Sequence, residues 1–142
     1  MKNTYESGGI ASFTGVVRDR GTEGKILTMT LEHYPGMTEN MLEKIEAEAH
    51  SRWNLENCLI IHRYGCLKPG DSIVTVLTAS AHRRTAFEAC EFLVDWLKTR
   101  APFWKKEENA NGTVHWVNTR SADYEAAARW DTEGHKDNCT DR

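Results

Sequence analysis

The sequence predicts a single α+β domain with a mixed, mainly antiparallel sheet and helices packed on it. Its 142 residues are sufficient for one hydrophobic core. Several short segments alternate apolar and polar side chains, as half-buried strands do, and longer segments repeat apolar residues at helical spacing. The predicted order of elements, β-β-α-β-β-α-β-β-α, mixes strands and helices in the way typical of this class.

The first two predicted strands cover residues 8–19 and 25–34. The first is apolar and rich in β-branched residues, which favour strands. The second alternates, so that one predicted face holds Leu27, Met29, Leu31 and His33 and the other Ile26, Thr28, Thr30 and Glu32. The polar turn between the two segments favours a hairpin.

A helix is predicted over residues 38–53, with Thr38 as its N-cap. Its apolar face repeats at helical spacing and consists of Met41, Leu42, Ile45, Ala49 and Trp53. Residues 57–65 predict a strand, and residues 66–71 a turn. The strongly β-branched segment 71–80 predicts another strand, which we expect at the centre of the sheet.

The longest predicted helix begins after Ser80, a suitable cap, and ends near residue 100 because the residue before Pro102 avoids the α region. Its apolar stripe is Ala86, Phe87, Cys90, Leu93, Val94 and Leu97. Two short strands then surround the Asn-Gly turn at 111–112, and a helix capped by Ser121 covers 121–130. We expect residues 1–130 to form the domain and residues 131–142 a flexible tail.

Charge and hydropathy exclude several classes of protein. The net charge of −3 argues against a general nucleic-acid-binding protein. Apolar runs fall short of the roughly 20 residues of a membrane helix, and the N-terminus lacks the apolar region of a signal peptide. We therefore expect a cytoplasmic protein with neither membrane nor nucleic acid as a partner.

The four cysteines lack the paired spacing typical of zinc sites, so free thiols in a reducing compartment are the simplest interpretation. A catalytic or persulfide cysteine stays an open alternative.

Positive charge gathers in the segment 97–107, where a proline and two aromatic residues lie among Lys98, Arg100, Lys105 and Lys106. Lys98 adjoins the apolar stripe of the predicted helix, so we expect it to be partly buried. Burial and neighbouring cations lower the pKa of a lysine, whose neutral amine can act as base or nucleophile. Strand alternation sends Lys105 and Lys106 to opposite faces, so only one of them should face Lys98.

The start of the same helix carries His82, Arg83 and Arg84. Free backbone N–H groups and two arginines at a helix N-terminus favour a phosphate site. The alternative is that the arginines point into solvent and His82 merely caps the helix. Arg18, at the end of the first predicted strand, is either a solvated arginine or a functional group presented by a strand end.

Five blocks resemble one family, the large, catalytic subunit of molybdopterin synthase: "FTGVVRD", "MTLEHYPGMTE", "IHRYGCLKPGD", "SAHRRTAFEAC" and "LKTRAPFWKKE". The resemblance runs from about Gly8 to Trp130. It implies an α/β-hammerhead-like fold and a sulfurtransferase that converts cyclic pyranopterin monophosphate (precursor Z) into molybdopterin by installing two sulfurs as a dithiolene.

The resemblance also implies partners. Sulfur arrives as a thiocarboxylate on the C-terminal Gly-Gly of a small ubiquitin-like carrier subunit, whose identity the sequence leaves open. The large subunit forms a homodimer, and the assembly is a heterotetramer. The small-molecule substrate is the pterin, and neither a cofactor nor a metal is expected.

Matched motif by motif, Lys98 corresponds to the family's essential lysine and Lys105 to a second functional lysine. Arg18 corresponds to the arginine of the substrate anion pocket, and His82 and Arg83 to pocket residues contributed by the other subunit of the dimer. The segments that line the substrate site correspond to Val16, Val17 and Arg18 and to Lys105, Lys106 and Glu107. The role of Lys98, acid/base or covalent, is left open, as is that of the tail after Trp130.

Two departures from the family pattern motivate other hypotheses. Val16 stands where many relatives carry a lysine, with Arg84 as a compensating cation, and relatives usually carry a longer N-terminal segment. A second hypothesis is therefore a non-catalytic binder of a ubiquitin-like carrier or an anion. A third is a sulfurtransferase that uses Cys66 or Cys90.

Overall fold

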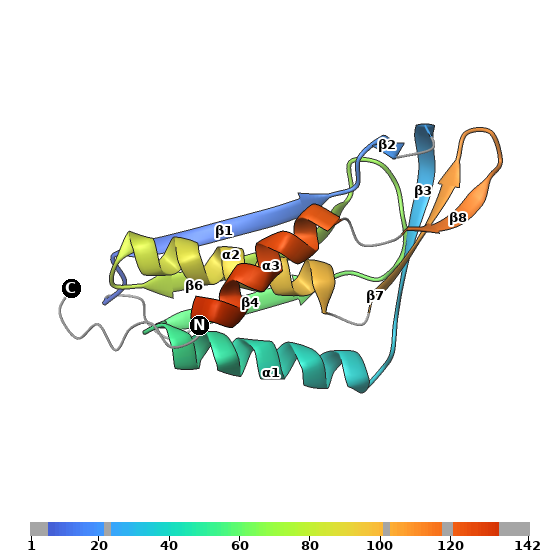
Figure 1. Ribbon diagram of the computed structural model, residues 1–142. Coiled ribbons are helices and arrows are strands. Elements are labelled where there is room, and N and C mark those ends of the chain that lie inside the picture. Colours follow the sequence, from blue (N-terminus) through green and yellow to red (C-terminus); the bar gives the residue numbers. More distant parts are fainter. Residues whose placement is uncertain (1–5, 22–23, 101–102, 118–120, 134–142) are drawn as a thin grey trace.

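The computed structural model describes residues 6–21, 24–100, 103–117 and 121–133 (Figure 1). The strands are β1 (Gly9–Val16), β2 (Arg20–Gly21), β3 (Gly24–His33), β4 (Asn57–His62), β5 (Gly65–Leu67), β6 (Ser72–Ser80), β7 (Phe103–Asn109) and β8 (Val114–Val117). The helices are α1 (Met37–Arg52), α2 (Arg83–Thr99) and α3 (Ser121–Glu133). This order confirms the predicted α+β class and adds the short strands β2 and β5.

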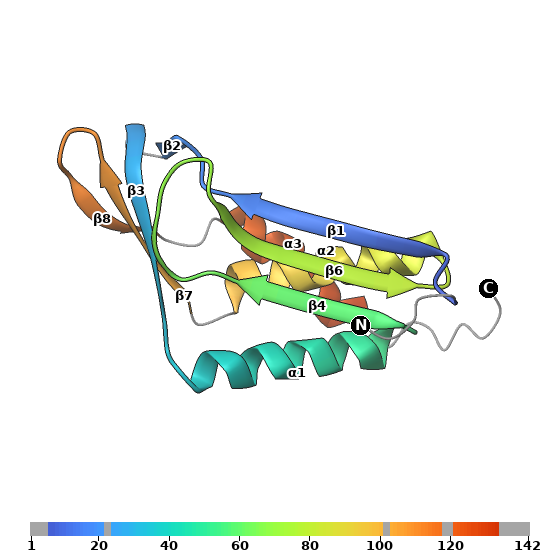
Figure 2. The same ribbon diagram turned by 180° about the vertical axis from the view of Figure 1, so that it is seen from behind.

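The described strands form two antiparallel sheets. The first sheet has the order β1-β6-β4, so β6 is central as predicted. The second sheet has the order β2-β3-β7-β8, with β5 also paired to β3. Helices α2 and α3 cover one face of the first sheet and α1 runs beside β4, while the second sheet stands at one end of this layer (Figures 1 and 2).

The predicted hairpin between the first two long strands is wrong. Strand β1 pairs with β6 from Gly9↔Ser80 onward, and β3 pairs with β7 in the other sheet. The register of β1 breaks at Gly15/Val16, and the next residue, Val17, donates its N–H to the Asp71 carbonyl. The chain thereby leaves the first sheet and enters the second.

A β-bulge changes the predicted faces of β3. Ile26, Met29 and Leu31 are all buried, whereas Leu27 is 46% exposed. Strict alternation would place Ile26 and Met29 on opposite faces. The pairing of β3 with β7 shifts between Ile26 and Thr28, and the extra residue restores the same side to both.

Helix α1 begins one residue earlier than predicted. Gly36, with a φ of 83°, is its N-cap, and the Glu39 carboxylate accepts the Gly36 N–H. Thr38 lies buried inside the helix, where its Oγ1 accepts the Tyr34 N–H at 3.1 Å. The N-cap assignment of Thr38 is therefore wrong, although Ile45 and Ala49 are buried as expected.

The N-cap position of helix α2 is His82 and not Ser80, and the His82 side chain makes no capping hydrogen bond. Ser80 is buried, and its Oγ donates to the Asn54 carbonyl at 2.9 Å. On the helix, Ala86, Cys90 and Leu93 are buried as predicted, but Phe87 is 64% exposed. The buried face instead continues through Ala89, Phe92 and Trp96.

The main core lies between α2 and the first sheet. Val76 of β6 is fully buried there with Ala86, Ala89 and Leu93 of the helix. The Thr78 hydroxyl, also buried, donates to the Ala86 carbonyl at 2.6 Å, which ties strand and helix by a polar contact as well. Small side chains on the helix let it approach the sheet closely.

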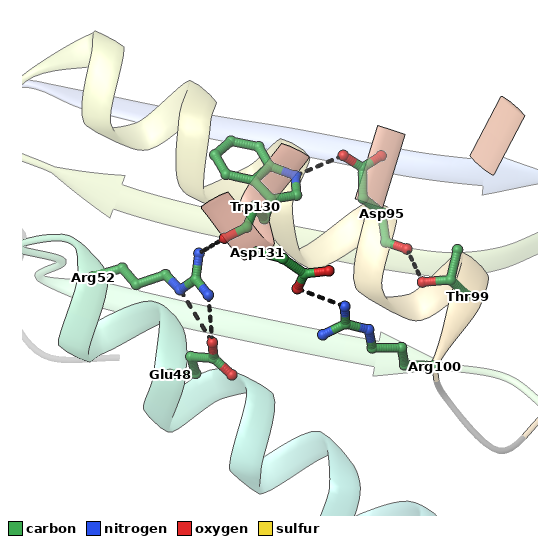
Figure 3. Close-up of polar contacts among 7 residues, drawn as sticks. All are labelled: Glu48, Arg52, Asp95, Thr99, Arg100, Trp130 and Asp131. Atoms are coloured by element: carbon green, nitrogen blue, oxygen red, sulfur yellow. Dashed lines mark hydrogen bonds and ion pairs between the residues drawn. The ribbon is translucent and has the colours of Figure 1, made fainter. Parts of the chain in front are cut away.

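Aromatic and polar contacts fix α3 to the other helices. The Trp130 ring meets Trp53 and Phe92 edge-on, at centroid distances of 5.5 and 5.6 Å. Its Nε1 donates to Asp95 Oδ2 at 2.8 Å, and its carbonyl accepts from Arg52 at 2.8 Å (Figure 3). These contacts anchor the last described turns of the chain to both α1 and α2.

The C-terminal predictions hold in outline. Strands β7 and β8 flank the Asn-Gly turn, where Gly112 has a φ of 84°. Helix α3 continues to Glu133, past the predicted end at residue 130. The Ser121 side chain and residues 134–142 lie outside the described residues, so the predicted cap and tail are not tested. Within the described part of the chain, none of the helices is long and apolar enough to span a membrane.

Truncation of Leu93 to Ala should lower the free energy of unfolding by about 2 to 5 kcal/mol, because it leaves a cavity in the main core. Phe87→Ala on the same helix removes a larger but exposed side chain and should change the free energy of unfolding by less than about 0.5 kcal/mol. Urea unfolding at matched protein concentration measures both. Equal losses in the two variants would mean that the buried face of α2 is misassigned.

Candidate active site

The predicted site cations divide into two groups at opposite ends of α2. His82, Arg83 and Arg84, here called the arginine group, lie at its start, and Lys98 lies in its last turn. With a rise of 1.5 Å per residue, sixteen residues separate His82 and Lys98 by about 24 Å. Within one chain, the two groups therefore cannot contact the same small ligand.

Lys98, Lys105 and His62, here called the lysine cluster, lie where the two sheets meet. Lys98 comes from the end of α2, Lys105 from β7 and His62 from the end of β4. Figures 1 and 2 both place the end of α2 at the junction between the first sheet and β7. Electrostatic interactions connect both lysines with His62, which indicates that the three groups are close together.

Lys105 is the lysine with the strongly perturbed pKa. Burial, followed by the positive charge of Lys98 and a hydrogen bond with it, lowers the pKa of Lys105 from 10.5 to about 8. The carboxylates of Asp123 and Glu107 oppose this shift. About one Lys105 in ten is then neutral at pH 7, against roughly one in 3,000 for an ordinary lysine. A neutral amine can act as a base or a nucleophile.

The expected partial burial of Lys98 is not found, whereas its role in catalysis stays a prediction. Lys98 is exposed, and it contributes the charge that perturbs Lys105. Two residues after the buried Trp96, Lys98 lies about 200° further around the helix, away from the core face. The half-buried lysine is instead Lys105, which lies on β7 where the two sheets meet.

Lys106 faces away from the lysine cluster, as strand alternation predicts for one of the two neighbours. Its Nζ lies over the Trp116 ring, 5.7 Å from the centroid, opposite on β8. The lysine that approaches Lys98 is Lys105. Trp104 is exposed and meets Tyr34 edge-on at 6.3 Å.

Glu107 lies on the same face of β7 as Lys105 but is 5% exposed. His115 Nε2 lies 3.5 Å from Glu107 Oε2. A Cβ on Gly21 would lie 2.5 Å from that same oxygen, so the absence of a side chain at residue 21 leaves room for the carboxylate. Glu107 therefore acts on the site through its charge beside Lys105.

The segment 16–18 ends β1 at the same end of the molecule as the lysine cluster, because α2 runs back along β6. Val16 and Arg18 are exposed. Val17 is 2% exposed and packs with Met29 and Leu31, its N–H donates to Asp71, and its carbonyl accepts from Gly70. The Val17 side chain therefore serves the second core, and the place of this residue in the substrate site stays a prediction.

The arginine group is exposed at the other end of β1. A Cβ on Gly9 would lie 3.3 Å from the Arg83 Cα, which puts Arg83 beside the start of that strand. The Arg84 side chain pairs with Glu88 at 3.0 Å. Val16, at the far end of β1, is separated from Arg84 by the length of the strand, so Arg84 does not replace a cation at residue 16 within one chain.

His62 belongs to the lysine cluster, although its sequence block predicts only a strand and a turn. Its ring stacks on Phe103 at 3.7 Å between centroids and 12° between planes. A signal was available: Cys58, Ile60 and His62 alternate on the less exposed side of β4. No comparable sequence pattern singles out Asp123, the charged neighbour of Lys105 that α3 contributes.

Two of the three described thiols, Cys58 and Cys90, fit a structural role better than a catalytic one. Burial raises the pKa of Cys58 to about 12 and also raises the pKa of Cys90, which disfavours the reactive thiolate. Cys66 is exposed on β5. Among the described residues, no group of three or more His, Cys, Asp or Glu is placed to hold a metal ion.

Comparison with family models and curated proteins gives consistent matches. A family model described as MoaE protein matches residues 1–100. The molybdopterin synthase catalytic subunit of Yersinia pestis is 53% identical over 125 residues, which cover 88% of this chain and 82% of that protein. The protein of the same name from Escherichia coli (strain K12) is 51% identical over 125 residues, with 88% and 83% coverage.

Solved structures match as well. A molybdopterin biosynthesis MoaE protein from Burkholderia ambifaria has 52% identity and a TM-score of 0.73, over 88% of this chain and 81% of that chain. Molybdopterin synthase from Staphylococcus aureus has 31% identity and a TM-score of 0.75, over 80% and 82%. A complex of subunits 1 and 2 of molybdopterin-converting factor from Helicobacter pylori, at 22% identity and a TM-score of 0.67, supports the fold alone.

Competitive labelling with acetic anhydride at a series of pH values should give Lys105 a reactivity midpoint near pH 8, because burial and Lys98 favour its neutral form. Lys98→Ala should move that midpoint upward, since a repelling charge is lost. Mass spectrometry of the Lys105 peptide measures both. The same peptide in urea is the control and should titrate near the ordinary value of about 10.4. A midpoint equal in folded and unfolded protein would refute the perturbed lysine.

Proposed function

The chain belongs to the MoaE protein family, and on that premise we propose that it is the catalytic subunit of a molybdopterin synthase. Its curated relatives carry this name at about half identity over most of both chains. The observation that carries the proposal is the half-buried Lys105 beside Lys98, at the point where the two sheets meet. A partly neutral amine next to a second cation suits acid/base chemistry on an anionic substrate.

The proposed reaction is sulfur transfer to cyclic pyranopterin monophosphate. A small ubiquitin-like carrier subunit supplies sulfur as a C-terminal thiocarboxylate. Its sulfur attacks a carbon of the pterin side chain, where a C–S bond forms as a C–O bond breaks and the oxygen leaves on the phosphate or as water. Water then hydrolyses the thioester, which breaks the bond between that sulfur and the carrier's carbonyl carbon and releases the carrier as a carboxylate. Two such transfers give the dithiolene of molybdopterin. Because the sulfur belongs to the carrier, the chain needs no catalytic cysteine, which agrees with the raised pKa values of Cys58 and Cys90.

The different surroundings of the two lysines suggest different roles. Lys105 has the lowered pKa and moves protons as general acid/base. Lys98 is exposed at the end of α2, where the tail of a carrier can reach it, and it binds the reacting carboxyl group. Arg18, exposed at the same end of β1, contributes charge to the bound phosphate.

The separation of the two cation groups supports a shared site in a homodimer. Since about 24 Å lies between them in one chain, His82 and Arg83 reach the phosphate at a lysine cluster only if they come from a second copy. The arginine group is exposed at a helix N-terminus, a favourable anion site. Two lysine clusters per dimer, each with one carrier, give the heterotetramer.

The second candidate function is a non-catalytic binder of the carrier. The observation behind it is Val16, a 48% exposed apolar side chain at a position where the resemblance implies a cation. This alternative requires carrier binding without turnover.

Reconstitution of the purified chain with precursor Z and thiocarboxylated carrier should yield molybdopterin, measured as its fluorescent oxidation product. Lys105→Met should lower the rate by about 10²-fold or more, the usual contribution of a general acid/base. Lys98→Ala should also abolish product while carrier binding is retained. Lys44→Ala, an exposed lysine of α1, is the control. Carrier binding by the unaltered chain with no product would favour the binder.

Mixing Lys98→Ala and Arg83→Ala protomers should recover activity that neither variant has alone. With random exchange, half of the dimers are mixed and one of their two sites is intact, so about one quarter of the full activity should return. Each variant mixed with itself is the control. A mixture as inactive as its components, with subunit exchange verified by mass spectrometry, would overturn the shared site.

A further inference from the structure

The buried carboxylate of Glu107 lies between two basic side chains on one face of the second sheet. Lys105 precedes it by two residues on β7, so both side chains point to the same side of that strand. His115 is the residue directly opposite Glu107 on β8. Directly opposite residues on neighbouring strands hold their Cβ atoms about 5 Å apart. The carboxylate can therefore be attracted along its own strand or across to the next one.

The structure gives this carboxylate a contact with His115. The Nε2 atom of His115 lies 3.5 Å from Glu107 Oε2. The same oxygen fills the space beside Gly21, where a Cβ would lie 2.5 Å from it. An Nε2–H is present in the imidazolium and in one neutral tautomer, and it directs positive charge at the oxygen. The ring and the missing side chain at residue 21 together define where the negative charge lies.

The charge of Glu107 also acts on Lys105. Burial and then Lys98 lower the pKa of Lys105, whereas the charges of Asp123 and Glu107 raise it. These charged groups come from α2, α3 and β7, and the β3 residue opposite Glu107 is the uncharged Met29. A movement of the carboxylate along this face therefore changes the proton affinity of Lys105.

We propose that His115 is a positioning residue for Lys105, which holds the Glu107 carboxylate toward β8 and so limits how strongly that charge retains the lysine proton. The consequence for turnover rests on the proposed function, whereas the effect on Lys105 does not. His115 acts through Glu107 and needs no contact with the substrate. A residue outside the five blocks of the resemblance then helps to set the neutral fraction of the half-buried lysine.

Two substitutions of His115 should move the reactivity midpoint of Lys105 in opposite directions. His115→Phe keeps a ring but removes the N–H, so the buried carboxylate turns toward Lys105 and the midpoint should rise above 8 by about 0.5. His115→Arg supplies a permanent bidentate partner that draws the carboxylate toward β8 and adds a cation, so the midpoint should fall by a similar amount. Competitive labelling with acetic anhydride measures both.

Glu107→Gln tests whether His115 acts through the carboxylate. This variant should by itself lower the midpoint, because a charge that favours the ammonium form is lost. Adding His115→Phe to it should cause no further change, since no carboxylate is left to move. Trp116→Phe is the matched control on the same strand, because Trp116 lies on the opposite face beside Lys106; its midpoint should stay near 8.

Turnover provides a second measurement. With precursor Z and thiocarboxylated carrier, the acidic limb of the pH profile of kcat should shift with the midpoint. At pH 7, His115→Phe should lower kcat about threefold, the factor that corresponds to about 0.5 in pH, and the plateau at high pH should be unchanged. If the unaltered chain makes no molybdopterin, the proposed function fails, but the labelling midpoints still decide whether His115 acts on Lys105.

A role of His115 in packing alone predicts another pattern. Both His115 variants would then fold and keep the midpoint of the unaltered chain, and this result would overturn the proposal. A shift caused by His115→Phe that persists in the Glu107→Gln background would overturn it as well. Should His115→Phe fold poorly, His115→Leu also lacks the N–H and should raise the midpoint.

Discussion

The antiparallel packing of α2 on β6 is the constraint on which the rest of the structure depends. Val76 is buried against small residues of the helix, and Thr78 donates to the Ala86 carbonyl, so strand and helix are held in one register. Because the helix runs back along the strand, its two ends lie at the two ends of the first sheet. One end presents the arginine group, and the other joins the second sheet at the lysine cluster. The length of α2 thus sets the distance between the arginine group and the lysine cluster.

Electrostatics at the lysine cluster explains why an acidic chain concentrates positive charge there. Two close ammonium groups in a half-buried place repel each other, and the repulsion makes one of them easy to deprotonate. Asp123 and Glu107 limit the effect, and His62 stays uncharged. Helix α3 contributes Asp123. The same helix is anchored by Trp130, so the contacts of this ring with Trp53 and Phe92 help to hold Asp123 in place.

Local patterns predicted the elements well, because turn residues and apolar periodicity act over a few neighbours. The class, the three helices, the central strand and the Asn-Gly turn all follow from such patterns. The pairing of β1 with β6 did not, since a polar turn favours a hairpin but does not decide which strands share a sheet. The alternation of apolar residues also does not reveal the bulge in β3, which turns Leu27 to the exposed side.

At the candidate site, the sequence predicts a group of cations in the segment 97–107 but not the relative burial of Lys98 and Lys105. Burial depends on which elements meet at the junction, and the sequence contains no local signal for that meeting. The expected burial of Lys98 is not found because a sequence neighbour such as Leu97 does not fix which side of the helix a residue occupies. The sequence does not single out His62, because a histidine at a strand end has no fixed chemistry until its neighbours are known.

A substitution at Gly21 would act on Lys105 through the Glu107 carboxylate. Replacement by any larger residue would displace the Glu107 carboxylate and, with it, one of the charges that set the proton affinity of Lys105. A variant in this two-residue strand would then change the proton affinity of Lys105, although residue 21 is not one of the charged groups around that lysine.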